Sequence, residues 1–241
     1  MMQQQQRPTN SRNQITLRGS TKIIVEFFEY CINSLLFQRG LYAPEYFKMT
    51  KKYGLNMLVT NNPEVKGHMR EILKQVEAWL MACKVEKLIL AIKSKETMTV
   101  LERWQFDIHN TKDQSSHTTS TTTTTSTDPF SRPLAGQVSS TATTASSPSK
   151  PKTEKTEKEI QTEIQAILRQ ITASVSFLPM LDEKCTWTIL CQTEKDAEVP
   201  ATWSDADPHL VHNAEQVKLR SFSTNLHKID ALVAYRLHDD I

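Results

Sequence analysis

Few side chains in this sequence have the types and spacing that catalysis or metal binding requires. His209 and His212 lie three residues apart in DPHLVHN, a spacing that could hold a metal ion on a helix. Neither a cysteine nor a third histidine lies close to them in the sequence, so we interpret both as solvated loop residues. The chain has no GxxxxGK phosphate loop and no GxGxxG motif, and its five glycines do not cluster. We therefore predict no catalytic residue, no metal site and no cofactor, in a protein that is not an enzyme.

One modification motif lies in a segment of unusual composition. Residues 115–149 contain 10 serines and 11 threonines, which cannot bury enough apolar surface to offset the entropy of ordering the chain. We predict a disordered insert at about residues 111–153, and also a disordered N-terminus over residues 1–13. Within the insert, Ser147 begins Ser-Pro-Ser-Lys, the S-P-x-K form that cyclin-dependent kinases prefer. Ser147 is therefore a candidate phosphosite.

Length and charge narrow the remaining classes of function. A chain of 241 residues suffices for one domain with a proper core. Its 29 basic and 27 acidic residues nearly balance, which predicts no general affinity for nucleic acid or an anionic membrane. Lys48, Lys51 and Lys52 are interpreted as a solvated surface. The apolar runs are too short to span a bilayer and no signal peptide is visible, so we predict a nuclear or cytosolic protein. The four cysteines, none in a CxxC pair, are predicted to be reduced and buried.

Hydrophobic periodicity predicts the elements that would position any site. Three long helices and several mostly antiparallel strands indicate an α+β domain with the helices on one face of a sheet. Ile15-Thr16-Leu17 is predicted to be a short edge strand. The expected helices run from Ser20 to Gly40, from Ala43 to Lys52, onward from the Asn62 cap, and from Glu154 to Ile171. The expected strands are Val85–Ile92, Val100–Ile108, Val175–Leu181 and Cys185–Cys191.

The last fifty residues carry the most unusual pattern. Val217 and Leu219 place apolar side chains on one face of a strand, whereas Phe222 belongs to the opposite face. A one-residue slip reverses the faces of a strand, so Arg220–Ser221 should hold a bulge or a change of partner. Farther on, Leu232–Tyr235 is apolar on both faces. This strand is either covered on both sides or able to bury either side.

Five segments closely resemble one known family. In chain order, these segments are ITLRGSTKIIVEFFEYCINSLLFQRGLY, YGLNMLVT, VLERWQFDI, EIQAILRQITASVSFLPML and VKLRSFSTNLHKIDALVAYRL. They are similar to the mitotic-arrest-deficient-two family of HORMA-domain proteins. The resemblance covers about residues 14–110 and 156–238. It implies a single HORMA domain over residues 14–241, with three main helices on one face of a mostly antiparallel sheet and a mobile C-terminal safety belt. It also implies an adaptor of the spindle assembly checkpoint that captures partner peptides and delays anaphase.

The resemblance implies two folded forms of the chain. In the open form the C-terminal hairpin covers the sheet edge that a partner peptide would use. In the closed form it moves to the opposite edge and displaces an N-terminal segment, here Ile15 to Leu17. We expect the peptide edge to be the strand Val175–Leu181. The residues expected at the edge and in the belt are Trp79, Val175, Phe177, Leu181, Val217, Leu219, Leu232, Val233 and Tyr235.

Partners also follow from the resemblance. They are the checkpoint scaffold mitotic-arrest-deficient-one, the anaphase-promoting-complex activator, and an AAA+ remodelling ATPase with its HORMA adaptor. An open–closed homodimer would use Arg169, Gln170, Phe177 and Arg220. The expected locations are nucleus, kinetochore and cytoplasm. Alternatives are another HORMA adaptor, of the translesion polymerase or meiotic-axis type, or a structural scaffold without a switch.

Overall fold

The computed structural model describes residues 15–111 and 155–237. The disorder predicted for residues 1–13 and 111–153 and the phosphosite Ser147 fall almost wholly outside these ranges. The elements are α1 Leu17–Gln38, η1 Pro44–Tyr46, β1 Phe47–Lys52, β2 Leu55–Thr60, α2 Pro63–Met81, β3 Val85–Ser94, β4 Val100–Asn110, α3 Glu157–Ala173, η3 Ser174–Ser176, β5 Cys185–Thr193, β6 Ala214–Lys218, β7 Phe222–Ser223 and β8 His227–Arg236.

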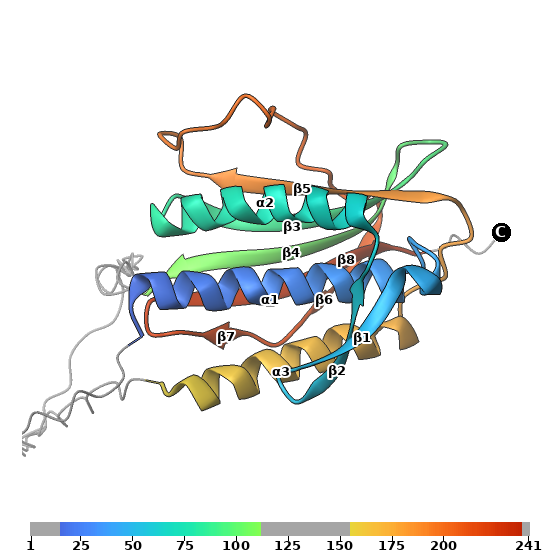
Figure 1. Cartoon of the computed structure of the whole chain (residues 1–241). Helices are drawn as coiled ribbons and strands as arrows, with labels where there is room; N and C mark the ends of the chain where they lie inside the picture. The colour runs from blue at the N-terminus through green and yellow to red at the C-terminus, as the bar shows by residue number, and fades with distance from the viewer. Residues whose placement is uncertain (1–14, 112–154, 238–241) are drawn as a thin grey trace, which may run out of the picture.

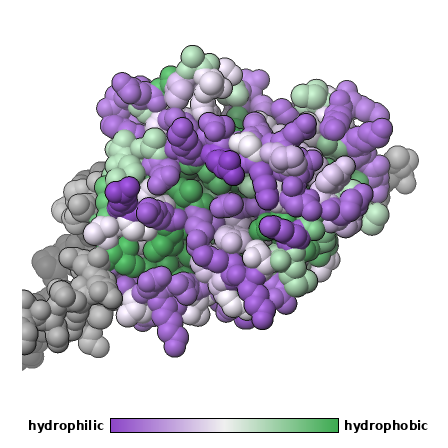
Figure 2. Space-filling view, viewed as in Figure 1, coloured by the Kyte–Doolittle hydropathy of each residue, from purple (hydrophilic) through white to green (hydrophobic). Residues whose placement is uncertain are grey.

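The larger sheet has the order β5-β3-β4-β8-β6, with β7 paired to β8 beside this path. Every strand pair in the described residues is antiparallel. The helices α1, α2 and α3 all lie on one face of this sheet (Figure 1). The predicted α+β architecture is therefore confirmed. The outer surface of the helical layer is mostly hydrophilic, as Figure 2 shows, so the apolar sides of the helices face the sheet.

The helices begin where their sequences supply caps. Asn62 accepts hydrogen bonds from the backbone N–H groups of Glu64 and Val65, and Pro63 occupies the first turn of α2. Thr156 and Glu159 form a capping box at the start of α3. At the other end of α1, Gly40 adopts a φ of 62°, a left-handed conformation that stops the helix at little cost for glycine.

An aromatic cluster binds α1 to the C-terminal half of the sheet. Phe27 of α1 lies 4.8 Å from Phe222 of β7 and 5.9 Å from Phe106 of β4, measured between ring centroids. All three side chains are almost fully buried. Aromatic side chains bury large areas, so this contact contributes strongly to the position of the C-terminal strands.

Two features of the C-terminal pattern are confirmed. Lys218 pairs with Leu232 and Phe222 pairs with Ile229, so four steps along one strand oppose three along the other. The extra residue is the predicted bulge around Arg220–Ser221. Strand β8 lies between β4 and β6, and Val233, Ala234 and Tyr235 are buried in succession. Because successive residues of a strand point to opposite faces, both faces of β8 are covered in this arrangement, which is the first of the two alternatives for this strand.

Three predicted elements are wrong. Residues 47–52 form strand β1 of a hairpin with β2, because Tyr53 and Gly54 both adopt positive φ and make a two-residue turn. The segment Ile15–Leu17 is not a strand, since the Thr16 hydroxyl accepts from Gly19 N at 3.2 Å and starts α1 at Leu17. Ser20, where this helix was predicted to begin, lies buried inside its first turns instead.

The third error concerns the expected strand Val175–Leu181. Ser174–Ser176 continues α3 as a 3-10 turn, in which the Phe177 and Leu178 N–H groups donate to the Ser174 carbonyl. Pro179 follows and has no N–H to offer a ladder. Three cysteines also depart from the prediction that all four are buried. Cys83 is exposed and Cys185 and Cys191 are half-buried, whereas Cys31 is buried. The burial of its thiol still raises the pKa of Cys191 to about 12.

Candidate peptide-binding edge and belt

The outermost strand on one side of the sheet is β5, which pairs with β3 and has no other strand beside it among the described residues. On its helical side, Trp187 Nε1 donates to the Tyr42 hydroxyl at 3.0 Å, and the Trp187 ring lies 5.5 Å from the ring of His68 on α2. A strand with an unpaired edge can accept an extended peptide through main-chain hydrogen bonds. The expectation that Val175, Phe177 and Leu181 form this edge is therefore wrong.

Residues 194–213, which we call the belt, connect β5 to β6 and arch past the free edge of β5 (Figure 1). On the helical side of the sheet, Trp79 Nε1 donates to the Glu198 carbonyl at 2.8 Å. The Trp79 and Trp203 rings meet edge to face with centroids 4.9 Å apart. Trp79 therefore contacts the belt at both Glu198 and Trp203.

The belt is fastened on the other face of the sheet as well. Neighbouring residues of a strand point to opposite faces of the sheet, and Glu102 and Trp104 on either side of Arg103 in β4 point into the core. The Arg103 side chain therefore lies on the face opposite the described helices. Arg103 Nε donates to the Pro208 carbonyl at 3.2 Å, and Lys93 Nζ lies 3.2 Å from His209 Nε2. The belt therefore passes from one face of the sheet to the other around β5.

The beginning of the belt is tied to the turn before β3. Lys84 Nζ bonds Glu194 at 2.6 Å and Asp196 at 2.8 Å, and the Glu194 N–H donates to the Lys84 carbonyl at 2.9 Å. The hydrogen bonds from Lys84 lower the pKa of Asp196. These charges are exposed, so their main effect is to set the direction in which the belt leaves β5.

The segment that leads into β5 is held by a buried ion pair. Arg39, at the end of α1, contacts Glu102 of β4 and also donates to the Pro179 carbonyl. Arg39 Nε lies 2.7 Å from Glu102 Oε1, and Trp104 Nε1 donates to the other carboxylate oxygen at 3.1 Å. Burial raises the pKa of Glu102, and the neighbouring Arg39 charge opposes that shift. The pair joins the core to the loop that positions the free edge.

The C-terminal hairpin lies at the edge opposite β5, where β8 pairs with β4 and β6 pairs with β8. Five of the residues expected at the peptide edge or in the C-terminal safety belt belong to this hairpin, namely Val217, Leu219, Leu232, Val233 and Tyr235. A buried polar contact fixes it to α1, since Ser20 Oγ lies 2.7 Å from His227 Nδ1 and 2.6 Å from Thr224 Oγ1. Burial lowers the pKa of His227.

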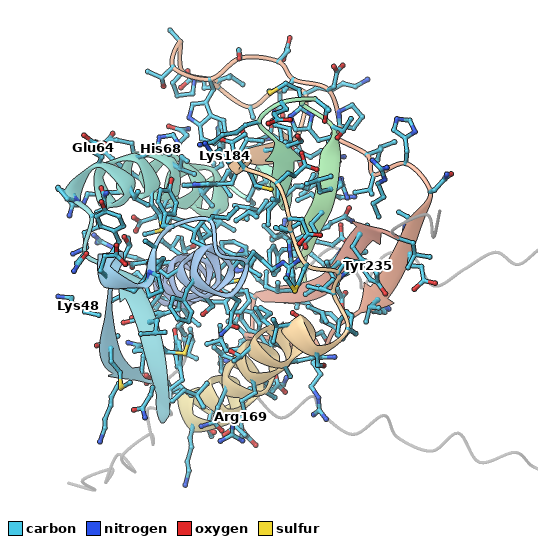
Figure 3. The ribbon with its side chains drawn as sticks, turned by 90° about the vertical axis from the view of Figure 1, so that its right-hand side faces the viewer. Lys48, Glu64, His68, Arg169, Lys184 and Tyr235 are labelled. Atoms are coloured by element: carbon cyan, nitrogen blue, oxygen red, sulfur yellow. The ribbon has the colours of Figure 1, made fainter. Side chains whose placement is uncertain are left out.

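Two of the residues expected at a dimer surface, Gln170 and Arg220, are in contact. Gln170 Oε1 accepts from the backbone N–H of Arg220 at 2.8 Å, which joins α3 to the bulge between β6 and β7. Arg169 is exposed and points away from the sheet on α3, as Figure 3 shows. The exposed Phe177 ring lies 6.0 Å from the ring of Tyr235. Without the family resemblance, Arg169 would be interpreted as an ordinary solvated arginine on a helix.

Sequence reasoning missed the outermost position of β5 and the contacts of Lys93, Arg103 and His209. The alternation of Cys185, Trp187 and Ile189 did predict a strand, but it carries no information about strand order. Within the described residues, no group of three or more histidine, cysteine or acidic side chains could hold a metal ion. None of the helices found there is long and apolar enough to cross a membrane.

The chain is similar to known proteins over nearly its whole length. The HORMA domain model matches residues 20–227. The mitotic spindle checkpoint component mad2 of Schizosaccharomyces pombe is 44% identical over 94% of this chain and 97% of that protein. The mitotic spindle assembly checkpoint protein MAD2A of Homo sapiens is 41% identical over 94% and 96%.

A solved structure agrees with these sequence similarities. A chain in the crystal structure of the mitotic checkpoint complex superposes with a TM-score of 0.71 at 43% identity, covering 91% of this chain and all of that chain. MAD2B of Bos taurus, a more distant relative, is only 20% identical over 90% of both chains. The chain therefore belongs to the HORMA domain family and, within it, to the Mad2 group of mitotic spindle checkpoint proteins.

Proposed function

We propose that this protein is a spindle assembly checkpoint adaptor that captures a short partner peptide between the free edge of β5 and the belt. The observation that carries the proposal is the course of the belt, which is anchored to Trp79 on one face of the sheet and to Arg103 on the other. A peptide added to β5 would gain main-chain hydrogen bonds and would pass beneath the belt.

The opposite edge would control release. Strand β6, which follows the belt, pairs with residues 232–236 of β8 and with no other described strand. A threaded peptide could leave only after this pairing is broken or the belt is lifted, so release should be slow for topological reasons. This supports a need for a remodelling ATPase of the AAA+ class, acting through its HORMA adaptor.

The peptides that we propose as partners come from the checkpoint scaffold mitotic-arrest-deficient-one and from the anaphase-promoting-complex activator. Holding the activator would delay anaphase, and binding the scaffold would bring the protein to kinetochores. We place the protein in the nucleus and cytoplasm otherwise, and assign it no catalytic step. The hairpin position matches the closed form, and an open copy would dimerise with it through Arg169, Gln170, Phe177 and Arg220. Ile15–Leu17 would then take the edge of β4 in the open copy.

The proposal is tested with overlapping synthetic peptides from the scaffold and activator of the same species. Retention of a fluorescent peptide through gel filtration is compared between the intact chain and a truncation that lacks residues 232–241. Because the truncation removes every partner of β6, we expect it to lose capture. A truncation that lacks only residues 238–241 is the matched control and should retain the peptide. Equal capture by all three chains would refute closure by the belt.

A further inference from the structure

Two neighbouring contacts hold the belt on the face of the sheet opposite the described helices. Arg103 Nε donates to the Pro208 carbonyl, and Lys93 Nζ lies 3.2 Å from His209 Nε2. His209 has a φ of 48°, a left-handed conformation that a residue other than glycine keeps only when its surroundings hold it. These contacts therefore fix a strained residue of the belt against β3 and β4.

We propose that Lys93 and His209 form a proton-sensitive latch, which holds the belt closed while the imidazole is neutral and loosens it when the imidazole gains a proton. The latch concerns the belt that would enclose a peptide, so its role in peptide release rests on the proposed function. The contact itself does not.

The chemistry of the two groups allows only one hydrogen bond between them. A lysine ammonium has three donors and no acceptor, so Lys93 must donate and His209 Nε2 must accept through its lone pair. The proton of the neutral ring then lies on Nδ1. A protonated ring has no lone pair left, and two cations 3.2 Å apart repel each other. Protonation therefore turns this attraction into a repulsion.

The charges around His209 agree with this direction. Burial lowers the pKa of His209, and Lys93 on β3 and Arg103 on β4 lower it further, while Asp207 within the belt opposes them. A histidine whose pKa is lowered by its site favours that site when neutral. The latch should thus be complete above about pH 6.5, the ordinary histidine pKa, and weaken as the pH falls below it.

Hydrogen exchange of the intact chain without peptide tests the latch directly. Exchange of backbone amides in residues 194–213 is measured by mass spectrometry at pH 7.5 and pH 5.5 and corrected for the intrinsic rates. We expect the corrected exchange to rise about tenfold at pH 5.5, the factor equivalent to 1.4 kcal/mol, as the loss of one hydrogen bond to a charged group would give. His209→Gln keeps an acceptor oxygen for Lys93 but does not titrate, so it should abolish the rise.

Two further variants separate the latch from general effects of acid. His212→Gln changes an exposed histidine three residues away and should respond to pH as the parent does. Lys93→Met should raise exchange at both pH values and reduce the difference between them, because burial and Arg103 still disfavour the protonated ring. A parent without a rise, or a rise of equal size in His209→Gln, would overturn the proposal. Because no peptide is present, these outcomes are independent of whether the protein captures one.

Discussion

Replacing Glu102 by glutamine removes one charge from an ion pair that is closed to solvent. The Arg39 and Glu102 side chains are only 5% and 2% exposed, so Arg39 would be left as an uncompensated buried charge. Breaking such a pair costs about 3–5 kcal/mol. The amide oxygen of glutamine can still accept from Arg39, so we expect a loss of about 3 kcal/mol in the free energy of unfolding. For a chain of this size, that corresponds to a fall in Tm of about 6–12 °C.

Urea unfolding at pH 7.5, followed by circular dichroism, measures this loss. The control is the double variant Arg39→Met with Glu102→Leu, which replaces both charges by apolar groups of similar size. It should recover stability to within about 1 kcal/mol of the parent, because no charge is left buried alone. A Glu102→Gln variant within about 0.5 kcal/mol of the parent would refute the reasoning, since a surface substitution could account for that much.

Three further predictions concern other parts of the chain. Because burial lowers the pKa of His227, its contribution to stability should be complete above about pH 6.5 and be lost in acid; the urea midpoint should fall more between pH 7 and pH 5 in the parent than in His227→Gln. Arg169→Ala should abolish self-association in light scattering yet keep peptide capture, and unchanged self-association would exclude a dimer contact there. Deleting residues 115–149 should leave peptide affinity, measured by calorimetry, within about threefold, and a tenfold loss would show that the insert contributes to binding.

The parts of the fold that were predicted correctly are those with a local signal. The cap at Asn62 and the helical spacing of Ile160, Ile164 and Ile167 are written within one element, and so they predicted α2 and α3. The bulge near Arg220 is also local, because a change from odd to even apolar positions can be read along one strand. Each of these signals depends on neighbours within a few residues.

The errors occurred where distant residues decide the outcome. Lys48–Lys52 pairs with β2 because of the Tyr53-Gly54 turn, and that pairing overrides a sequence that could also form a helix. The position of β5 at the edge depends on the order of five strands, which no single strand encodes. Arg39 and Glu102 are 63 positions apart, and no periodicity connects them. Pro179 cannot donate to a strand ladder, but this local signal does not distinguish an edge strand from the absence of a strand.

The two-faced pattern of β8 links the stability of the fold to its proposed switch. As β8 lies between β4 and β6, its nine residue pairs with β4 would all have to break before the hairpin could leave. The hairpin carries its own neighbour in β6, so it can move as a unit without losing those contacts. The described residues on either side of the long insert also contact the turn between β7 and β8. Thr111 N donates to the Leu226 carbonyl at 2.9 Å, and Lys155 N donates to Asn225 Oδ1 at 3.0 Å. Two packings within a few kcal/mol of each other can therefore be separated by a high barrier, because every one of these contacts must be lost before any new one forms.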